Sequence, residues 1–380
     1  MEARLLGWLR DREAEMADLL SRLAIAESPS LVPGAECEAL ELVAEELRAA
    51  GFAVRFVHAG QGSHLYARPE DRSRGAPYQL VLGHVDTVWP LGTTAAMPPR
   101  VEHGRLYGPG VYDMKGGLVQ LIFALRALHE LGATPAVDPV VFVNSDEEVG
   151  SEGSVRWIRP LAAGAVRALV LEPPSSPDGS VKTARKGIGR YRVAVRGRAA
   201  HAGTSPEEGV SAIRELAHQV ERLFELNDRD RGITVNVGTL DGGLRANVVA
   251  PEAHALVDVR VRDSDTAVEL DRAVRAPGAL PPGIAVTVDG GFGRPPMIAT
   301  DRNRELARRA HVLGRRLGLD VGEAGQVGGG SDANFTSELT ATLDGLGSVG
   351  DGAHAADEHV VVHSLAERAA LLALMLLEPA

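Results

Sequence analysis

Cysteine is almost absent from this chain, because Cys37 is the single example in 380 residues. A lone cysteine cannot form an intrachain disulfide, which favours a reducing compartment and predicts a cytoplasmic location. Lysine is scarce too, since only Lys115, Lys182 and Lys186 occur among the 40 basic residues. This bias toward arginine can reflect genome composition or stability as well as function, so it excludes no class of protein.

Long hydrophobic runs are also missing. No apolar stretch approaches the roughly 20 residues that a membrane span needs. Residues 1–24 place leucines at helical spacing among acids and arginines, which predicts one amphipathic helix and no signal peptide. A net charge of −11 argues against nucleic acid as a partner. We therefore expect neither a membrane nor nucleic acid among the partners of this chain.

Hydrophobic residues make up 44% of the sequence, which suffices for a large core and two domains. The first part alternates helices with strands, which predicts an α/β domain whose mixed sheet is flanked by helices. Strands and helices between residues 186 and 294 predict an inserted α+β, ferredoxin-like domain with a four-stranded antiparallel sheet. The stretch Gly290–Pro296 resembles a return linker. We therefore expect a discontinuous first domain, formed by residues 1–185 and 295–380.

A histidine and an acid stand where one apolar run ends. His84 closes the run that begins at Val81, and Asp86 comes two residues later. On an extended chain both side chains face the same way, so Asp86 can accept the far N–H of His84, as an acid behind a metal-bound histidine does. Open α/β sheets bind ligands at this edge. Asp113, at the start of an expected helix over residues 116–131, is a further candidate ligand.

Other acids end the next two expected strands. One apolar run leads into the adjacent pair Glu147 and Glu148, and the following run leads into Glu172. Adjacent acids repel each other in a dry pocket unless a cation neutralises them. His354 lies in a loop before the final helix. These residues could give each of two zinc ions one imidazole plus carboxylates.

Plainer interpretations exist for several of these residues. Glu147 and Glu148 also suit a helix N-terminus, where acids are favoured by the helix dipole. His359 competes with His354 for the role of late ligand, since it stands five residues further on. The stretch Gly328–Asp332 could be a flexible turn, or could bring backbone N–H groups toward a substrate carboxylate.

Seven motifs follow one another along nearly the whole chain: G-H-V-D-T-V, Y-G-x-G-x-x-D-M-K-G-G, D-E-E-x-G-S, R-A-A-H-A-G, R-A-N-V-V, G-G-G-S-D-A and G-x-H-x-x-D-E. In this order they resemble the co-catalytic zinc aminoacylase and carboxypeptidase family. That family includes acetylornithine deacetylase, succinyl-diaminopimelate desuccinylase and bacterial glutamate carboxypeptidase. Pro109 stands where the first two branches usually carry arginine, a departure that favours the carboxypeptidase branch.

The resemblance implies a role for each candidate residue. His84 and Glu172 would hold one metal ion, Glu148 and His354 the other, and Asp113 would bridge them. Glu147 would be the general base, and the ions would be Zn²⁺, for which Co²⁺ or Mn²⁺ could substitute. The resemblance also places His354 ahead of His359 and implies a cis peptide bond between Asp113 and Met114.

The inserted domain would act as a lid and as the contact between the subunits of a homodimer. By resemblance, Arg260 would bind the free α-carboxylate of the substrate, and Asn247 and His201 would contact the scissile carbonyl. His201 would do so in the site of the neighbouring subunit. Gly330 would offer its backbone to the substrate.

These expectations describe a two-metal hydrolase that cleaves an amide bond in a small peptide or N-acyl amino acid. A glutamate carboxypeptidase-like peptidase fits first, because of the Gly108–Gly110 turn and the two last motifs. A deacylase of N-acyl amino acids, like acetylornithine deacetylase, is the alternative. A ligand-binding protein without catalysis is a third interpretation, although a binder would not need Glu147.

Overall fold

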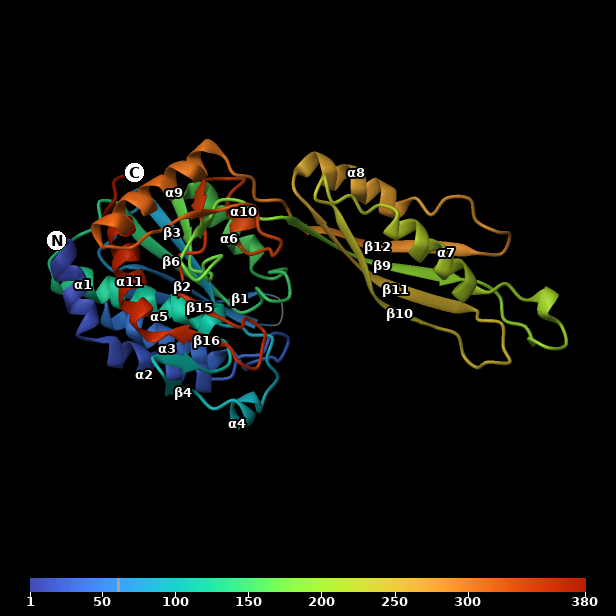
Figure 1. Cartoon of the computed structure of the whole chain (residues 1–380), viewed down its shortest axis with the longest axis horizontal. Helices are drawn as coiled ribbons and strands as arrows, with labels where there is room; N and C mark the ends of the chain where they lie inside the picture. The colour runs from blue at the N-terminus through green and yellow to red at the C-terminus, as the bar shows by residue number, and fades with distance from the viewer. Residues whose placement is uncertain (60–61) are drawn as a thin grey trace. The chain divides into compact units, whose positions relative to one another are not determined.

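The computed structural model describes residues 1–59 and 62–380. The chain divides into two compact units (Figure 1). Unit 1 contains Met1–Ala184, Ala299–Val327 and Ser331–Ala380, and unit 2 contains Arg185–Ile298 and Gly328–Gly330. Unit 2 therefore extends a few residues beyond the expected range of 186–294, and it includes Gly330, which the sequence expectation placed in the first domain. In the described ranges no helix is both long and apolar enough to cross a membrane.

Unit 1 is built on a mixed sheet. The antiparallel pair β1 (Phe52–Ala59) and β2 (Gly62–Pro69) forms one edge, and β2 runs antiparallel to β6. The strands β6 (Asp138–Asn144), β3 (Tyr78–His84), β7 (Arg167–Val170) and β14 (Ala341–Leu343) then lie side by side and parallel. Parallel neighbours bring their carboxyl ends to one edge, where the sequence placed the candidate ligands.

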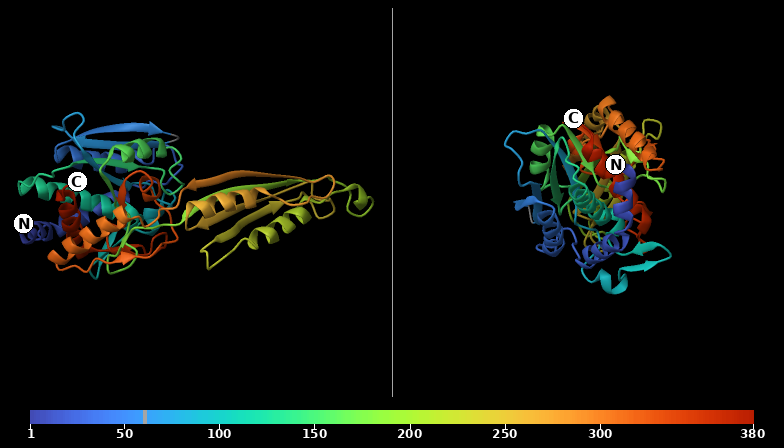
Figure 2. Two further views of the ribbon diagram at one scale, coloured as in Figure 1. Left: turned by 90° about the horizontal axis from the view of Figure 1, so that it is seen from above. Right: turned by 90° about the vertical axis from the view of Figure 1, so that its left-hand side faces the viewer.

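Helices cover both faces of this sheet (Figure 2). The main core forms where α5 and α11 pack together and against the helices that open the chain, with side chains such as Leu9, Leu20, Phe123 and Leu371 fully buried. The α/β architecture with a mixed sheet is thus as predicted. The helices of unit 1 are α1 (Glu2–Arg10), α2 (Glu13–Ile25), α3 (Cys37–Ala49), α4 (Thr93–Ala96), α5 (Gly116–Glu130), α6 (Val155–Gly164), α9 (Asp301–Arg316), α10 (Ala333–Thr336) and α11 (Val362–Leu377).

The single N-terminal helix expected over residues 1–24 was wrong, because the chain breaks between α1 and α2. Arg12 leaves helical geometry at φ −118° and ψ 15°. The break lets α1 bury Leu5 and Leu9 while α2 buries its own apolar face, including Met16 and Leu20. Helical spacing alone does not show such a turn.

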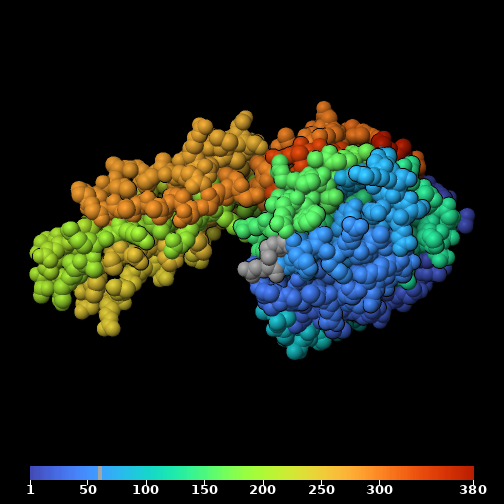
Figure 3. Space-filling model, turned by 180° about the vertical axis from the view of Figure 1, so that it is seen from behind, coloured from blue at the N-terminus to red at the C-terminus, as the bar shows by residue number. Residues whose placement is uncertain are grey.

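Short elements complete unit 1. A small sheet joins β4 (Arg100–Glu102), β5 (Arg105–Tyr107), β16 (His359–Val361) and β15 (Gly350–Asp351), and β8 (Val181–Lys182) pairs with β13 (Glu323–Ala324). The kinked segment η1 (Val111–Lys115), whose backbone leaves helical geometry at Asp113 and Met114, leads into α5. Figure 3 shows another face, where the segment of β1 and β2 (blue) borders the segment of α6 (green). Arg156 in α6 donates to the backbone carbonyl of His58 in β1 at 2.6 Å.

Unit 2 has the expected α+β arrangement. Its antiparallel sheet has the order β10 (Thr234–Gly242), β11 (Glu252–Val261), β9 (Gly187–Arg196) and β12 (Ala285–Arg294). Helices α7 (Ala212–Phe224) and α8 (Ser264–Arg275) pack on it, and a 3₁₀ turn η2 (Pro206–Glu208) precedes α7. With two helices between these strands, this order is ferredoxin-like. The expected linker Gly290–Pro296 was partly wrong, because strand β12 continues through its glycines to Arg294.

Candidate metal centre

Three neighbouring parallel strands deliver the candidate residues to one edge of the unit 1 sheet. β3 ends at His84, the acids Glu147 and Glu148 follow β6, and Glu172 follows β7. Asp113 arrives from η1, and His354 comes from the loop between β15 and β16. All of these residues lie within unit 1.

The side chains form two groups that share one carboxylate. In the first, His84 Nε2 lies 3.3 Å from Asp113 Oδ1 and 3.6 Å from Glu172 Oε1. In the second, His354 Nε2 lies 3.2 Å from Glu148 Oε1 and 3.5 Å from Asp113 Oδ2. The ligand atoms of each group lie within 4.8 Å of one another, as ligands of one ion must. Asp113 faces both groups with different oxygens, which is the arrangement of a bridging carboxylate.

The unpaired atoms of the first group fit a cation. His84 Nδ1 donates to the backbone carbonyl of Asp86 at 2.9 Å, which directs Nε2 toward the acids. His84 Nε2 and Asp113 Oδ1 are both buried without a hydrogen-bond partner. Burying a polar atom without a hydrogen-bond partner costs free energy. An imidazole together with carboxylates is a set of ligands that Zn²⁺ binds. The residues present therefore fit a metal ion.

The pKa shifts agree with a site that is stabilised by positive charge. Burial opposes a charge on His84, but its contacts with Asp113 and Asp86 raise its pKa well above the usual value. Contacts with Asp113 and Glu148 raise the pKa of His354 to about 10. Burial alone would raise the pKa of Asp113, but its close contacts with the two histidines outweigh burial and lower it. Imidazolium charge thus stabilises the ionised form of Asp113, whereas burial raises the pKa of Glu148. A metal ion would supply positive charge to both carboxylates.

Asp86 serves the site differently from the sequence expectation. Its carboxylate accepts the backbone N–H groups of Glu147 at 3.2 Å and Glu148 at 3.1 Å, and the hydroxyl of Ser30 at 2.7 Å. The carboxylate is 3.4 Å from His84 Nδ1, whereas the backbone carbonyl of Asp86 takes the shorter contact. The expectation that the carboxylate accepts the imidazole N–H was therefore only partly right, because the backbone carbonyl of the same residue lies closer to Nδ1.

Glu147 precedes Glu148 in the chain and belongs to neither group. Its side chain is buried, and its backbone is held by Asp86. The peptide bond between Asp113 and Met114 is cis, as the family resemblance implied. His354 has a positive φ of 63°, in the left-handed region that side chains other than glycine rarely adopt.

The remaining candidate residues lie in unit 2. His201 is exposed, and its Nδ1 accepts the backbone N–H groups of Gly203 and Thr204, both at 3.1 Å. Asn247 adjoins it, because its carbonyl accepts the N–H of Ala202 at 3.0 Å. His201 and Asn247 therefore lie in two loops that are joined by a backbone hydrogen bond.

Arg260 is engaged by a neighbour on its own strand. Its Nε and Nη2 donate to the two carboxylate oxygens of Asp258 at 2.6 and 2.9 Å. The carbonyl of Gly330 accepts a hydrogen bond from Arg185 Nη1 at 3.2 Å. Neither Asp258 nor Arg185 was a candidate in the sequence analysis, although Asp258 lies two residues before Arg260.

The sequence reasoning also missed buried groups that support the site. Asp332, treated only as part of a turn, accepts hydrogen bonds from Asn144 at 2.8 Å and Ser151 at 2.5 Å, and so fastens the end of β6. Lys115 is buried and donates to the carbonyls of Leu23 and Ala26 at the end of α2. Burial lowers the pKa of Lys115 to about 8. Its position in the D-M-K-G-G motif was the available signal.

The alternative ligand His359 takes no part in either group. Its ring packs against Tyr107 with centroids 5.2 Å apart, and Nδ1 donates to the carbonyl of Asp357 at 2.9 Å. Within the described residues, the histidine of the first group is His84 and that of the second group is His354. His354 is thus the histidine that the fold brings to the acids.

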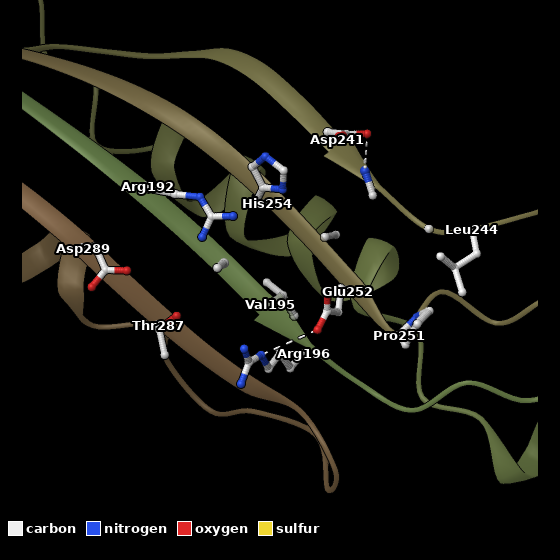
Figure 4. Close-up of a pocket in the computed structure, with 14 residues that line it drawn as sticks. Arg192, Val195, Arg196, Asp241, Leu244, Pro251, Glu252, His254, Thr287 and Asp289 are labelled. Atoms are coloured by element: carbon white, nitrogen blue, oxygen red, sulfur yellow. Dashed lines mark hydrogen bonds and ion pairs between the residues drawn. The ribbon is translucent and has the colours of Figure 1, made fainter.

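A separate pocket of about 470 Å³ lies on the sheet of unit 2 (Figure 4). Side chains of both charges line it, among them Arg192, Glu252, His254 and Asp289. Arg196 and Glu252 form an ion pair at 3.8 Å on its rim. None of its lining residues belongs to the two ligand groups.

Known proteins align with most of this chain. The chain is 31% identical over 312 residues to carboxypeptidase G2 of Pseudomonas sp. (strain RS-16), covering 81% of this chain and 75% of that protein. It is 28% identical over 354 residues to succinyl-diaminopimelate desuccinylase of Azoarcus sp. (strain BH72), covering 89% of this chain and 91% of that protein.

Solved structures share the fold. The aminopeptidase PepT of Bacillus cereus ATCC 10987 superposes with a TM-score of 0.76 at 21% identity, covering 97% of this chain and 98% of that one. The M20 family metallo-carboxypeptidase Sso-CP2 of Sulfolobus solfataricus superposes with a TM-score of 0.75 at 16% identity, covering 96% of this chain and 99% of that one. Residues 80–378 match the model of peptidase family M20/M25/M40. The chain therefore belongs to peptidase family M20/M25/M40.

Proposed function

We propose that this protein is a dizinc hydrolase that cleaves an amide bond in small substrates with a free carboxylate, as a glutamate carboxypeptidase-like peptidase. The observation that carries the proposal is the pair of ligand groups that share Asp113, with Glu147 beside them. Membership of a metallopeptidase family supports metal-dependent amide hydrolysis. The similarity to carboxypeptidase G2 supports the choice of branch.

The ligands divide between two ions. His84 and Glu172 would hold one, Glu148 and His354 the other, and Asp113 would use one oxygen for each. Zinc at these positions would lower the pKa of a water molecule and polarise the scissile carbonyl, and Co²⁺ or Mn²⁺ could substitute for it. Asp86 keeps the two neighbouring acids in their distinct positions by holding their backbone N–H groups.

Glu147 would act as general base and then as general acid. Glu147 is buried, adjoins the proposed ligand Glu148 in sequence and belongs to neither group, so in this proposal its carboxylate would accept a proton from the attacking water. The same carboxyl group would return that proton to the leaving amine. A protein that only binds its ligand would have no use for this group, which argues against the non-catalytic interpretation.

Unit 2 would supply the recognition of the substrate. Arg260 presents a planar guanidinium, which suits a free carboxylate. Asp258 holds its Nε and Nη2, and Nη1 donates to the carbonyl of Gly328 at 3.5 Å, a contact that a substrate carboxylate would replace. Because His201 Nδ1 accepts two N–H groups, Nε2 carries the proton and can donate to a carbonyl oxygen. Asn247 would contact the same carbonyl, and the backbone of Gly330 would approach the substrate.

A homodimer would complete each site. In this proposal unit 2 is the lid and the dimer contact, and His201 of one subunit serves the metal centre of the other. Closed two-fold symmetry allows such an exchange of residues between identical chains.

A deacylase of N-acyl amino acids is the second candidate. The similarity to succinyl-diaminopimelate desuccinylase, which extends over 89% of this chain, favours it. The chemistry at the amide would be the same, so the acyl group and the leaving amine decide between the two functions.

A substrate panel tests the proposal. Dipeptides, N-acyl glutamates and N-acetyl amino acids would be offered to the protein loaded with Zn²⁺ or Co²⁺, and release of the amine would be measured. Preferred cleavage of dipeptides with a C-terminal glutamate supports the peptidase, and preferred cleavage of N-acetyl amino acids supports the deacylase. Two bound metal ions without turnover on any substrate would support the ligand-binding interpretation instead.

A further inference from the structure

A buried carboxylate outside the ligand groups gathers the loops that carry the ligands. Glu358 is 1% exposed and stands just before β16. Its Oε2 accepts the indole N–H of Trp89 and the backbone N–H of Gly110, both at 2.9 Å. Its Oε1 accepts the backbone N–H groups of Tyr112 at 3.0 Å and Asp113 at 3.1 Å. Four N–H groups thus converge on one carboxylate.

These donors come from separate parts of unit 1. Trp89 belongs to the segment that follows His84, and Gly110 to Asp113 form the turn that presents the shared ligand. Glu358 itself belongs to the loop that carries His354, and its backbone carbonyl accepts the N–H of Gly108 at 3.2 Å. One side chain therefore connects the segments of three candidate ligands.

The turn before α5 is shaped to receive an anion. Gly110 adopts the left-handed φ of 71°, which lets the N–H groups around it point to one side. Successive N–H groups in such a turn form a concave anion site, and Glu358 fills it. A buried carboxylate is costly without such donors, so a residue needed only for its volume would be apolar here.

We propose that Glu358 is a positioning residue for the metal centre: it fixes the Asp113 turn against the His354 loop so that Asp113 faces both ions. The proposal deepens the proposed function and rests on the two-metal site. Because Asp113 serves both groups, a shift of its turn should weaken both ions together. Loss of a ligand that serves one group, such as Glu172, should weaken one ion first.

Glu358→Gln is the decisive variant. Its amide keeps the shape of the side chain, but the NH₂ group faces two N–H donors whichever way it is turned. Asp357→Asn is the matched control, because it removes the same charge from the adjacent, exposed position. Trp89→Phe removes one of the four donors and leaves those from the Asp113 turn.

The experiment uses the full chain, stripped of metal with a chelator and checked for folding by circular dichroism. Co²⁺ is then titrated into each protein, and binding is followed by equilibrium dialysis and by visible absorption. Glu358→Gln should lower the affinity for both ions by about 10 to 100-fold and alter the Co²⁺ absorption bands. Asp357→Asn should match the wild type, and Trp89→Phe should show a smaller loss in the same direction.

The outcomes distinguish a failure of the positioning role of Glu358 from a failure of the proposed hydrolase function. If Glu358→Gln binds two Co²⁺ ions with the affinity and spectrum of the wild type, Glu358 is not a positioning residue. Loss of only one ion would equally overturn the proposal. If this variant does not fold, an unchanged affinity and spectrum in Trp89→Phe would overturn it. A wild type that binds two ions but hydrolyses nothing would refute the function alone, and a wild type that binds no Co²⁺ would refute both.

Discussion

The carboxylate of Asp86 accepts a hydrogen bond from the backbone nitrogen of Glu147 at 3.2 Å. Its second oxygen accepts the N–H of the next residue, Glu148, at 3.1 Å. One buried acid thus holds the backbone of two adjacent acids, one of which belongs to a ligand group and one of which does not. Asp86 thus fixes the backbone of both the proposed base, Glu147, and the proposed ligand, Glu148.

The exchange of Glu147 for glutamine should abolish turnover and spare metal binding. Glutamine keeps the shape of the side chain but cannot take a proton from water, so kcat should fall by roughly 10² to 10⁴. Metal analysis after dialysis should still find two ions for each chain.

Glu148→Gln is the matched control for this prediction. Glu148 Oε1 lies 3.2 Å from His354 Nε2 in the second group, so this variant should lose metal from that group. If Glu147→Gln lost metal and Glu148→Gln kept both ions, the roles of the adjacent pair would be reversed.

Arg260→Lys should weaken the binding of substrates with a free carboxylate. Lysine keeps the charge but loses the planar fork that Asp258 holds at 2.6 and 2.9 Å. Loss of a hydrogen bond to a charged group, about 1.5 to 3 kcal/mol, corresponds to a rise in KM of about 10 to 100-fold. The same substrate with its carboxylate converted to an amide provides the control. An equal loss on both substrates would mean that Arg260 does not bind the carboxylate.

Acid should destabilise the protein through His64. This ring is buried, its Nδ1 accepts the N–H of Ser145 at 3.2 Å, and burial lowers its pKa although nearby acids oppose the shift. The unfolded chain binds a proton near pH 6.5 and the folded chain resists it, so stability present above about pH 6.5 is lost as the pH falls toward the lowered pKa.

His64→Asn tests this pH dependence, since asparagine can keep an acceptor near the position of Nδ1. Thermal unfolding of the chelator-treated protein would be measured between pH 5 and pH 8. The Tm of the variant should fall less on acidification than that of the wild type. His58→Asn, which removes an exposed histidine from β1, should leave the wild-type slope unchanged. Equal slopes in all three proteins would exclude His64 as the cause.

The candidate ligands could be foreseen because strand ends are visible in the sequence. His84, Glu148 and Glu172 each follow an apolar run, and parallel strands then bring them to one edge. The partner of each polar group was harder to foresee. The carboxylate of Asp86 bonds to backbone N–H groups of a distant loop, and Glu358 fills a site formed by backbone N–H groups, which no side-chain pattern records.

The break between α1 and α2 and the extension of β12 were missed for a different reason. Helical spacing continues across residues 10 to 13, and only tertiary burial of Leu9 and Met16 on separate helices distinguishes two helices from one. In β12, glycines that usually mark a linker pair with β9 instead, because the sheet supplies partners for their backbone groups.

The last prediction concerns His201 and the proposed dimer. Its Nδ1 accepts two backbone N–H groups, which leaves the Nε2 proton for a carbonyl oxygen. His201→Ala should lower kcat by about 10² to 10³, as loss of an oxyanion donor does, while metal content stays the same. That result alone would not show which subunit the histidine serves.

Mixed dimers would identify the subunit. A dimer of one His201→Ala chain and one Glu147→Gln chain contains a site with a working base and, if His201 acts across the interface, a working histidine from the partner. Activity should therefore return when the two inactive proteins exchange subunits, and mass measurement should confirm the mixed species. If mixed dimers form and no activity returns, His201 acts within its own chain or has no catalytic role. A protein that stays monomeric at assay concentration would exclude the exchange altogether, because a histidine of a second chain would then never reach the metal centre.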